Sequence, residues 1–243
     1  MIEVRDLGKS FGDVVALTDV SFSARDGEVT GLLGPNGAGK TTSLRVLYGL
    51  LRADRGTVTV DGVDVEKEQQ RAQRLLGVLP DAHGLYARLT AREHMRYFGA
   101  LQGMDRPTLD KNIQELSDLL GMHGIIDRRV QGFSHGERVK VAMARALVHG
   151  PTNVVLDEPT NGLDVGSTRA MRKLIRSMKA QGRCVLFSSH VMHEVTALCD
   201  RIIIIADGRT VAQGTPDEII AQTDRSSLED AFVSLTGIDE LLP

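Results

Sequence analysis

The chain has 243 residues, of which 42% are hydrophobic and 25% charged, the usual composition of a globular protein with one large domain or two closely joined lobes. Its formal net charge of −3 gives no basic excess that would favour nucleic acid as a partner. No apolar run approaches the roughly 18–20 residues that span a bilayer, and the charged, alternating residues 1–6 do not resemble a signal peptide. Cys184 and Cys199 are interpreted as buried, reduced thiols, so we expect a cytosolic protein or one on the cytosolic face of a membrane.

The first zone, residues 1 to about 65, alternates strands and turns. Strands are expected over residues 2–7, 20–23 and 56–60, and the last ends at the turn Asp61-Gly62. The apolar run 29–33 predicts a buried strand, and residues 43–47 continue as a helix.

Residues 34–42 lie between that strand and that helix and fit the phosphate-binding pattern G-x-x-x-x-G-K followed by Ser or Thr. They are Gly34, Pro35, Asn36, Gly37, Ala38, Gly39, Lys40, Thr41 and Thr42. Glycines let the backbone turn tightly and point its N–H groups at phosphate oxygens, close to the positive end of the helix. Lys40 would supply a positive charge and Thr41 a hydroxyl for magnesium. The order of strand, loop and helix favours nucleotide binding over a glycine-rich turn without a ligand.

The second half of the chain changes character twice. Residues from about 86 to 150 are expected to be mostly helical, because 91–101 and 109–120 carry apolar residues at helical spacing. From residue 153, strands at 153–157 and 184–188 alternate with helices at 168–179 and 191–198, and a short helix is expected over 227–235. This alternation predicts a parallel sheet covered by helices, with a helical block inserted between two halves.

Asp157 and Glu158 follow an apolar run and therefore end a buried strand at the edge where ligands bind in open α/β sheets. Asp157 can help hold magnesium, and Glu158 can polarise an attacking water. The alternative is a strand that ends in two solvated acids. The phosphate loop upstream favours the functional interpretation.

Ser134 precedes a predicted helix that runs through residues 142–147, and Glu137 stands three residues later. This spacing is typical of a capping box. A second phosphate-binding helix N-terminus fits the same residues. Residue chemistry alone does not favour either interpretation, the capping box or the phosphate-binding helix N-terminus.

The phosphate loop is followed, in order, by Phe-Ser-His-Gly-Glu at 133–137, Asp-Glu-Pro-Thr at 157–160, Asn-Gly-Leu-Asp at 161–164 and Ser-Ser-His at 188–190. Together they resemble the nucleotide-binding subunit of an ATP-binding cassette (ABC) transporter. The resemblance implies an ABC ATPase domain over residues 1–220, with a helical subdomain inserted at about 86–150, and a short helical tail at 221–243. The implied α/β fold is a P-loop NTPase (RecA-like) with a mostly parallel sheet and an N-terminal antiparallel β subdomain.

The resemblance also implies roles for single residues. Phe11 would stack on adenine where Tyr is usual. Glu158 would be the catalytic base or water-orienting residue, and His190 the switch histidine that senses the γ-phosphate. Lys40 would contact the same phosphates, and Asp157 would hold magnesium.

Other matching positions imply a dimer. Ser134 and Gly136 would contact the γ-phosphate of ATP bound to the other protomer, and Asp164 would lie in the loop that couples the two sites. The implied mechanism is a homodimer that closes head to tail over two ATP molecules, with Mg²⁺, and drives a membrane-spanning permease. The implied place is the cytoplasmic face of the membrane, and no nucleic acid is expected.

Two positions depart from the family pattern. His135 stands where the signature Leu-Ser-Gly-Gly-Gln has glycine, which affects the geometry of closure and its pH dependence. Asp81 stands where the magnesium-contacting loop usually has Gln. An acid can ligate magnesium but cannot donate the hydrogen bonds of an amide.

Residues 79–90 and 228–237 resemble exporters of the ABC-2 type, including sodium-export (NatA-type) and drug-export ATPases. Sodium is the cargo expected by this analogy, with drug or other small-molecule or polymer export as the alternative. His83 and Tyr86 lie in the loop that approaches the membrane subunit in this family. A non-transport cassette acting on nucleic acid or ribosomes usually has two cassettes or a coiled-coil insertion. A regulatory module that binds nucleotide without hydrolysing it is a further alternative. The presence of Lys40, Glu158 and His190 together is an argument against it.

Overall fold

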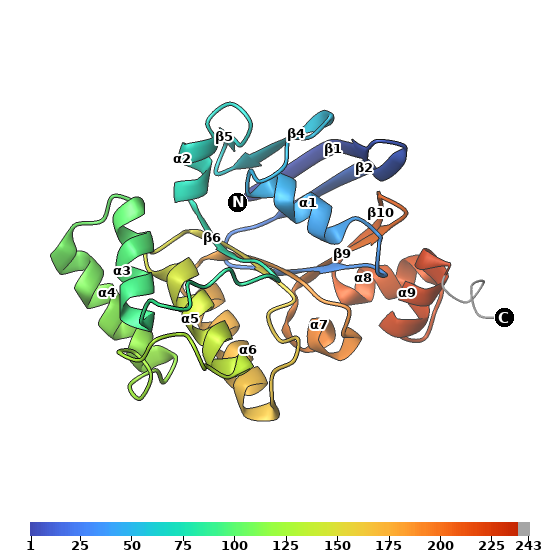
Figure 1. Cartoon of the computed structure of the whole chain (residues 1–243). Helices are drawn as coiled ribbons and strands as arrows, with labels where there is room; N and C mark the ends of the chain where they lie inside the picture. The colour runs from blue at the N-terminus through green and yellow to red at the C-terminus, as the bar shows by residue number, and fades with distance from the viewer. Residues whose placement is uncertain (238–243) are drawn as a thin grey trace.

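A computed structural model describes residues 1–237 of the chain (Figure 1). The strands of the described part are β1 (Ile2–Phe11), β2 (Val14–Ala24), β3 (Val29–Leu33), β4 (Arg55–Val60), β5 (Val63–Asp64), β6 (Leu76–Leu79), β7 (Asn153–Asp157), β8 (Cys184–Ser188), β9 (Arg201–Ala206) and β10 (Arg209–Gly214). The helices there are α1 (Lys40–Leu47), α2 (Gln69–Arg74), α3 (Ala91–Leu101), α4 (Arg106–Leu119), α5 (His135–Leu147), α6 (Val165–Ala180), α7 (Met192–Leu198), α8 (Pro216–Thr223) and α9 (Leu228–Thr236). No helix among residues 1–237 is long and apolar enough to cross a membrane.

The strands form one continuous sheet in the order β5-β4-β1-β2-β10-β9-β3-β8-β7-β6. The β5-β4-β1-β2 part is antiparallel, and the β9-β3-β8-β7-β6 part is parallel. They meet at β10, which is antiparallel to β9 and joins β2 through the single pair Arg209 and Asp19. The predicted α/β architecture, with a parallel core and an N-terminal antiparallel part, is confirmed.

Helices cover both faces of this sheet. α1 lies inside the curl between the antiparallel strands and the parallel strands, and α5 to α9 lie on the opposite side (Figure 1). Every residue of β3, β7 and β8 is buried, which explains why these strands are continuous apolar runs in the sequence. One hydrophobic core packs around α1, and a second lies between the sheet and α5 to α9.

The helical block occupies one end of the molecule, where α3 and α4 lie beside α5 (Figure 1). α5 is buried on two faces, because Ala142 and Met143 belong to the core under the sheet while Val141 and Ala144 belong to the core of the helical block. This helix therefore fixes the block against the sheet.

The predicted elements agree with the structure in type, but several ends differ. β1 and β2 are longer than the predicted strands 2–7 and 20–23, and two helices begin earlier than predicted because a cap was missed. α6 begins at Val165 and not at 168, because the side chain of Asp164 accepts a hydrogen bond from the backbone N–H of Ser167 at 2.7 Å. α4 begins early for the same reason, with Asp105 as its cap. The sequence analysis missed α8, although Thr215 and Glu218 form a capping box at its start. α9 corresponds to the predicted helix 227–235, and residues 238–243 of the expected tail lie outside the described residues.

Candidate functional site

The phosphate-binding loop connects β3 to α1, and its glycines are required by close contacts. Gly39 has φ +104°, and a Cβ there would lie 2.9 Å from the carbonyl oxygen of Ala16. A Cβ on Gly34 would lie 2.3 Å from the carbonyl oxygen of Ile205. Any other residue at these positions would push neighbouring backbone away, so the loop holds its shape only with glycine.

Lys40 is the first residue of α1, and its side chain folds back over the loop. Its Nζ donates hydrogen bonds to the carbonyl oxygens of Gly34 at 2.6 Å and Pro35 at 3.0 Å. Burial lowers the pKa of Lys40, whereas the nearby carboxylates of Glu158 and Asp157 act to raise it. The loop therefore holds one positive charge beside two carboxylates, over an open hollow.

That hollow is a cavity of about 420 Å³. It is lined by Ala16, Asn36, Gly37, Ala38, Gly39, Lys40, Thr41, Thr42, Asp81, Asp157, Glu158, Asn161 and His190. The structure thus brings together residues 36–42 of the phosphate loop, both carboxylates of the 157–158 pair, Asp81 and His190. Ala16 and Asn161 were not predicted to take part. Asn161 belongs to a recognised motif, but nothing local in the sequence points to Ala16.

Asp157 ends β7 and is 3% exposed. Its Oδ1 accepts a hydrogen bond from Ser188 Oγ at 2.6 Å, while its Oδ2 has no partner in the described part of the chain. Burial raises the pKa of Asp157 despite the Ser188 bond, and repulsion from Asp81 and Glu158 adds to the rise. A buried carboxylate oxygen without a partner is costly, and it is expected where a ligand supplies the missing contact.

Glu158 has φ +50°, a left-handed backbone conformation that is uncommon for a residue other than glycine. Its backbone N–H donates to Ser188 Oγ at 3.0 Å, and its carboxylate Oε2 lies 2.9 Å from His190 Nδ1. The Glu158 side chain is 17% exposed and the His190 side chain 54% exposed. Backbone strain of this kind often occurs at functional sites, where it aims a side chain.

The residues present fit magnesium. The orphaned Oδ2 of Asp157, the hydroxyl of Thr41 and the carboxylate of Asp81 line one cavity, and all three groups offer the oxygen ligands that this ion takes. Within residues 1–237, no group of three or more His, Cys, Asp or Glu side chains is placed to hold a metal. Magnesium here would therefore depend on nucleotide phosphates and water for its other ligands.

The remaining predicted site residues lie outside the cavity. Ser134 caps α5 and forms the expected capping box with Glu137. A Cβ on Gly136 would lie 3.3 Å from Ser167 Oγ, which places Gly136 against the first turn of α6. Asp164 caps that same helix, and Phe11 lies at the end of β1 with 48% of its surface exposed. None of these four residues lines the cavity that contains the phosphate loop and Glu158.

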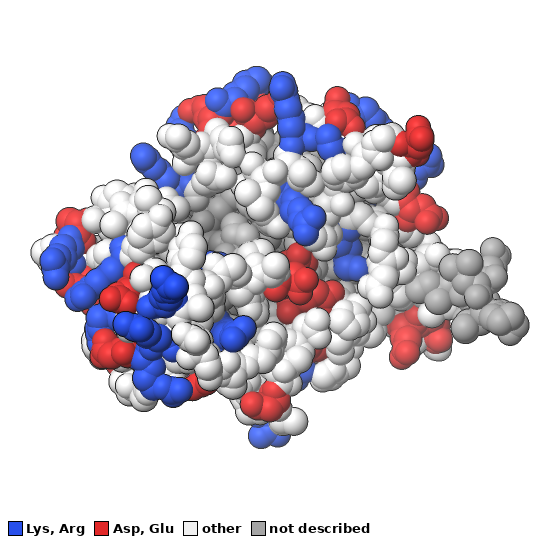
Figure 2. Space-filling model, viewed as in Figure 1, with Lys and Arg blue, Asp and Glu red and all other residues white. Residues whose placement is uncertain are grey.

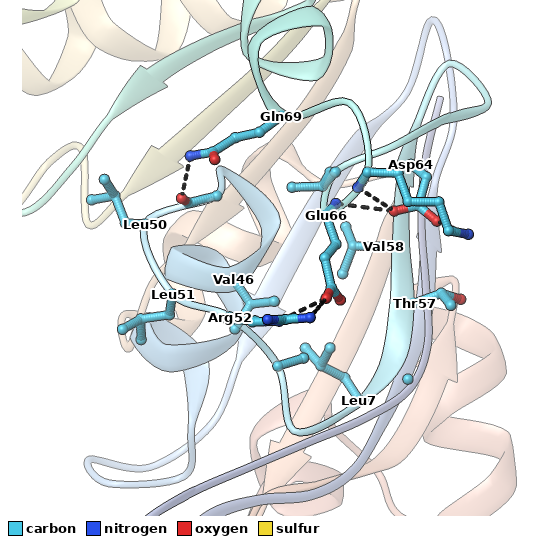
Figure 3. Close-up of a pocket in the computed structure, with 15 residues that line it drawn as sticks. Leu7, Val46, Leu50, Leu51, Arg52, Thr57, Val58, Asp64, Glu66 and Gln69 are labelled. Atoms are coloured by element: carbon cyan, nitrogen blue, oxygen red, sulfur yellow. Dashed lines mark hydrogen bonds and ion pairs between the residues drawn. The ribbon is translucent and has the colours of Figure 1, made fainter.

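A second cavity, of about 500 Å³, lies between α1, β4 and β5 (Figure 3). Its charged side chains pair with one another: Arg52 Nε donates to Glu66 Oε1 at 2.7 Å, and Lys67 Nζ donates to Asp64 Oδ2 at 2.9 Å. No residue of the phosphate loop lines it. The smaller cavity is thus the candidate site, because the phosphate loop lines it and Oδ2 of Asp157 has no partner among the described residues.

Comparisons with known proteins agree with this geometry. The sequence model of the ABC transporter family matches residues 17–161. The chain is 43% identical over 239 residues to the ABC transporter ATP-binding protein NatA of Bacillus subtilis, a match that covers 96% of this chain and 97% of NatA. It is 33% identical over 240 residues to the linearmycin resistance ATP-binding protein LnrL of the same organism, covering 99% of this chain and 76% of LnrL. A match of 38% identity over 219 residues to the Nod factor export ATP-binding protein I of Burkholderia lata covers 90% of this chain and 72% of that protein.

Two solved structures share the fold. An ATP-binding subunit of an ABC transporter superimposes with a TM-score of 0.91 at 30% identity, over 97% of this chain and 99% of the other. A dimeric bacterial ABC transporter cassette gives a TM-score of 0.80 at 23% identity, over 88% of this chain and 98% of the other. With the phosphate loop, the carboxylate pair and His190 gathered in one cavity, the chain belongs to the ABC transporter family, as an ATP-binding subunit that is an ATPase.

Proposed function

We propose that the chain is the ATP-hydrolysing subunit of an ABC-type membrane exporter, and that two copies close head to tail over two ATP molecules. One observation carries the proposal: the cavity joins the phosphate loop to Glu158 and His190, whereas Ser134 and Gly136, at the N-terminus of α5, do not line it. We infer that each chain carries two different half-sites, one around the phosphate loop and the other around Ser134 and Gly136. A second copy related by a two-fold axis supplies the missing half to both. The match to a dimeric cassette supports this arrangement.

In the proposed site, the N–H groups of the loop 34–42 and Lys40 bind the phosphates, and Phe11 stacks on adenine. Glu158 orients the attacking water and accepts its proton, and His190 holds the Glu158 carboxylate while sensing the γ-phosphate. Thr41, Asp157 and Asp81 would hold magnesium, which neutralises charge on the phosphates when bound. Asp164 carries the coupling between the two sites of the dimer.

The proposed partner is a membrane-spanning permease, which would hold the cassette at the cytoplasmic face of the membrane. A groove of about 370 Å³ supports this partner, lined among others by Tyr48, Pro80, Phe98 and Arg145. Tyr86, from the loop expected to approach the permease, stacks near Phe98 and is 52% exposed. The face in Figure 2 mixes basic and acidic side chains without a continuous basic stripe, so this face does not have the charge pattern of a nucleic-acid site.

For the cargo we propose sodium first, by analogy with NatA-type exporters, since the chain matches NatA over almost its whole length. Drug or polymer export is the alternative, suggested by the likeness to LnrL and to the Nod factor export proteins. We also retain the domain division proposed above: an ABC ATPase domain over residues 1–220 with a helical subdomain at about 86–150, and a tail from 221. Sodium tolerance of cells that express the chain with its permease, compared with their tolerance of drugs, separates the two cargo classes.

Steady-state ATP hydrolysis by the wild type and by Glu158→Gln tests the proposed mechanism. Light scattering follows dimerisation in both proteins. We expect wild-type turnover, and in the variant a loss of roughly 100- to 10,000-fold with a trapped ATP-bound dimer. Turnover close to wild type in Glu158→Gln would contradict the role given to Glu158. ATP binding without turnover in the wild type, with or without the permease, would favour a regulatory cassette.

A further inference from the structure

His135 contacts residues of two other loops, Asn161 in the loop after β7 and His83 in the loop after β6. It is the first residue of α5, directly after the cap Ser134. Its Nε2 lies 2.9 Å from the carbonyl oxygen of Asn161, and its ring centroid lies 5.7 Å from that of His83, in the loop after β6. Because a carbonyl oxygen only accepts, Nε2 must carry a proton, and Nε2–H donates a hydrogen bond to the carbonyl oxygen of Asn161.

The loop on the other side of this hydrogen bond is shaped to receive the ring. Gly162 has φ +69°, and a Cβ there would lie 3.3 Å from His135 Nε2. A larger residue at 162 would press on the imidazole and disturb its bond to Asn161. The usual family signature has glycine at position 135. In this chain the position carries a histidine, whose ring packs against Gly162 and bonds to Asn161.

Asn161 links His135 to the cavity. Asn161 lines the cavity, and its backbone N–H donates a hydrogen bond to the backbone carbonyl oxygen of Glu158 at 3.1 Å. One residue therefore bonds His135 through its C=O and Glu158 through its N–H. A short chain of two hydrogen bonds therefore runs from the N-terminus of α5 to the backbone carbonyl of Glu158, the residue whose carboxylate lies beside His190.

We infer that His135 is a positioning residue, which ties the α5 surface expected to meet the partner's ATP to the Glu158–Asp164 loop of the chain's own ATP site. The inference rests on the proposed head-to-tail dimer for its role in turnover, but not for the tie itself. The hydrogen bond from His135 to Asn161 restricts the 158–164 loop before the dimer closes. Less conformational entropy is therefore lost when the two chains close over ATP. His135 touches neither the phosphate loop nor Lys40, so binding of ATP to one chain does not depend on it.

The test compares His135→Leu, which fills similar space without a donor, with His135→Gln, whose side-chain amide offers an N–H at about the place of Nε2. Because His135 is exposed, both variants are expected to fold. His123→Leu, in an exposed turn that does not line the cavity, is the matched control. Hydrogen exchange of residues 158–164 in the ATP-free protein reads the tie directly. Exchange is expected to accelerate roughly two- to tenfold in H135L, the net worth of one hydrogen bond, and to stay near wild type in H135Q and His123→Leu.

Turnover is the second readout. In H135L, kcat is expected to fall by a similar factor while the ATP dissociation constant stays within about twofold, and H135Q is expected to restore kcat. Unchanged exchange over 158–164 in H135L overturns the inference whatever the turnover. A kcat in H135L equal to or higher than that of the wild type overturns the positioning role. The hydrogen bond would then either not contribute to turnover or stabilise the open dimer. A wild type that neither binds nor hydrolyses ATP would refute the proposed function instead, and the exchange experiment would still decide the tie.

Discussion

His190 Nδ1 lies 2.9 Å from the carboxylate oxygen Oε2 of Glu158, although 32 positions separate the two residues in the sequence. The contact follows from sheet register, because Asp157 of β7 pairs with Ser188 of β8, and the two side chains emerge just beyond these parallel strands. The imidazole can therefore hold the carboxylate in one orientation beside the phosphate loop.

This contact predicts the effect of removing the imidazole. His190→Ala leaves Glu158 free to rotate, and turnover is expected to fall roughly 100-fold because a mispositioned base loses its aim at the water. ATP affinity should change little, since the loop and Lys40 are untouched. Steady-state hydrolysis and calorimetric ATP binding measure the two effects. His193→Ala is the matched control, because His193 contacts Arg172 and not the cavity. Equal turnover in wild type and His190→Ala would refute the role of this contact.

Lys40 supplies the positive charge of the phosphate loop. Lys40→Ala is expected to weaken ATP binding roughly 10- to 100-fold, the usual worth of hydrogen bonds to a charged group. Fluorescence or calorimetric titration with ATP measures the change. Lys67→Ala removes a lysine that pairs with Asp64 in the other cavity, and it should leave the affinity unchanged. An unaltered dissociation constant in Lys40→Ala would count against the phosphate-loop assignment.

Asp157 is expected to contribute to function at a cost in stability. Burial raises its pKa above the unfolded value of 3.8, so the folded state binds the proton more tightly than the unfolded state does. The cost is therefore absent below the unfolded pKa and grows as the pH rises through the folded-state pKa. Asp157→Asn keeps an oxygen to accept from Ser188 and removes the charge. We expect the variant to lose hydrolysis and, without nucleotide at pH 7, to gain about 1 kcal/mol, or roughly 2–4 °C in melting temperature.

Thermal unfolding followed across pH tests this expectation. The gain should vanish below about pH 3, where the wild-type carboxyl is protonated in both states. Asp13→Asn, in the exposed β1–β2 turn, should show no gain at either pH. A melting temperature of Asp157→Asn that is lower than wild type at pH 7 would contradict the argument.

Glu194 stabilises the helix that follows His190. Its carboxylate is buried, lies 3.5 Å from Arg172 Nη2 of α6, and accepts a hydrogen bond from Thr160. Glu194→Ala leaves Arg172 without a carboxylate and is expected to cost about 3 kcal/mol in the free energy of unfolding. Arg172→Ala combined with Glu194→Ala should cost less than the sum of the single changes, because no lone charge remains. Urea unfolding of the four proteins in this cycle measures the coupling, and strict additivity would argue against the pair.

Local sequence patterns determined the elements and the phosphate loop. The strands 153–157 and 184–188 and the helix 91–101 have the predicted bounds, because buried apolar runs and helical spacing are properties of neighbouring residues. The glycines, Lys40 and the capping box at Ser134 also follow from short patterns. α8 shows the limit of the method, since its capping box is present but the helix was missed.

Only the tertiary structure decided which of these pieces meet. The gathering of Asp81, Glu158 and His190, the inclusion of Ala16 and Asn161, and the bond from His135 to Asn161 all join residues that are distant in the sequence. The order and register of the parallel strands set these distances, and no local periodicity encodes them. The separation of Ser134 and Gly136 from the phosphate loop has the same origin, because α5 and α1 lie on opposite sides of the sheet (Figure 1).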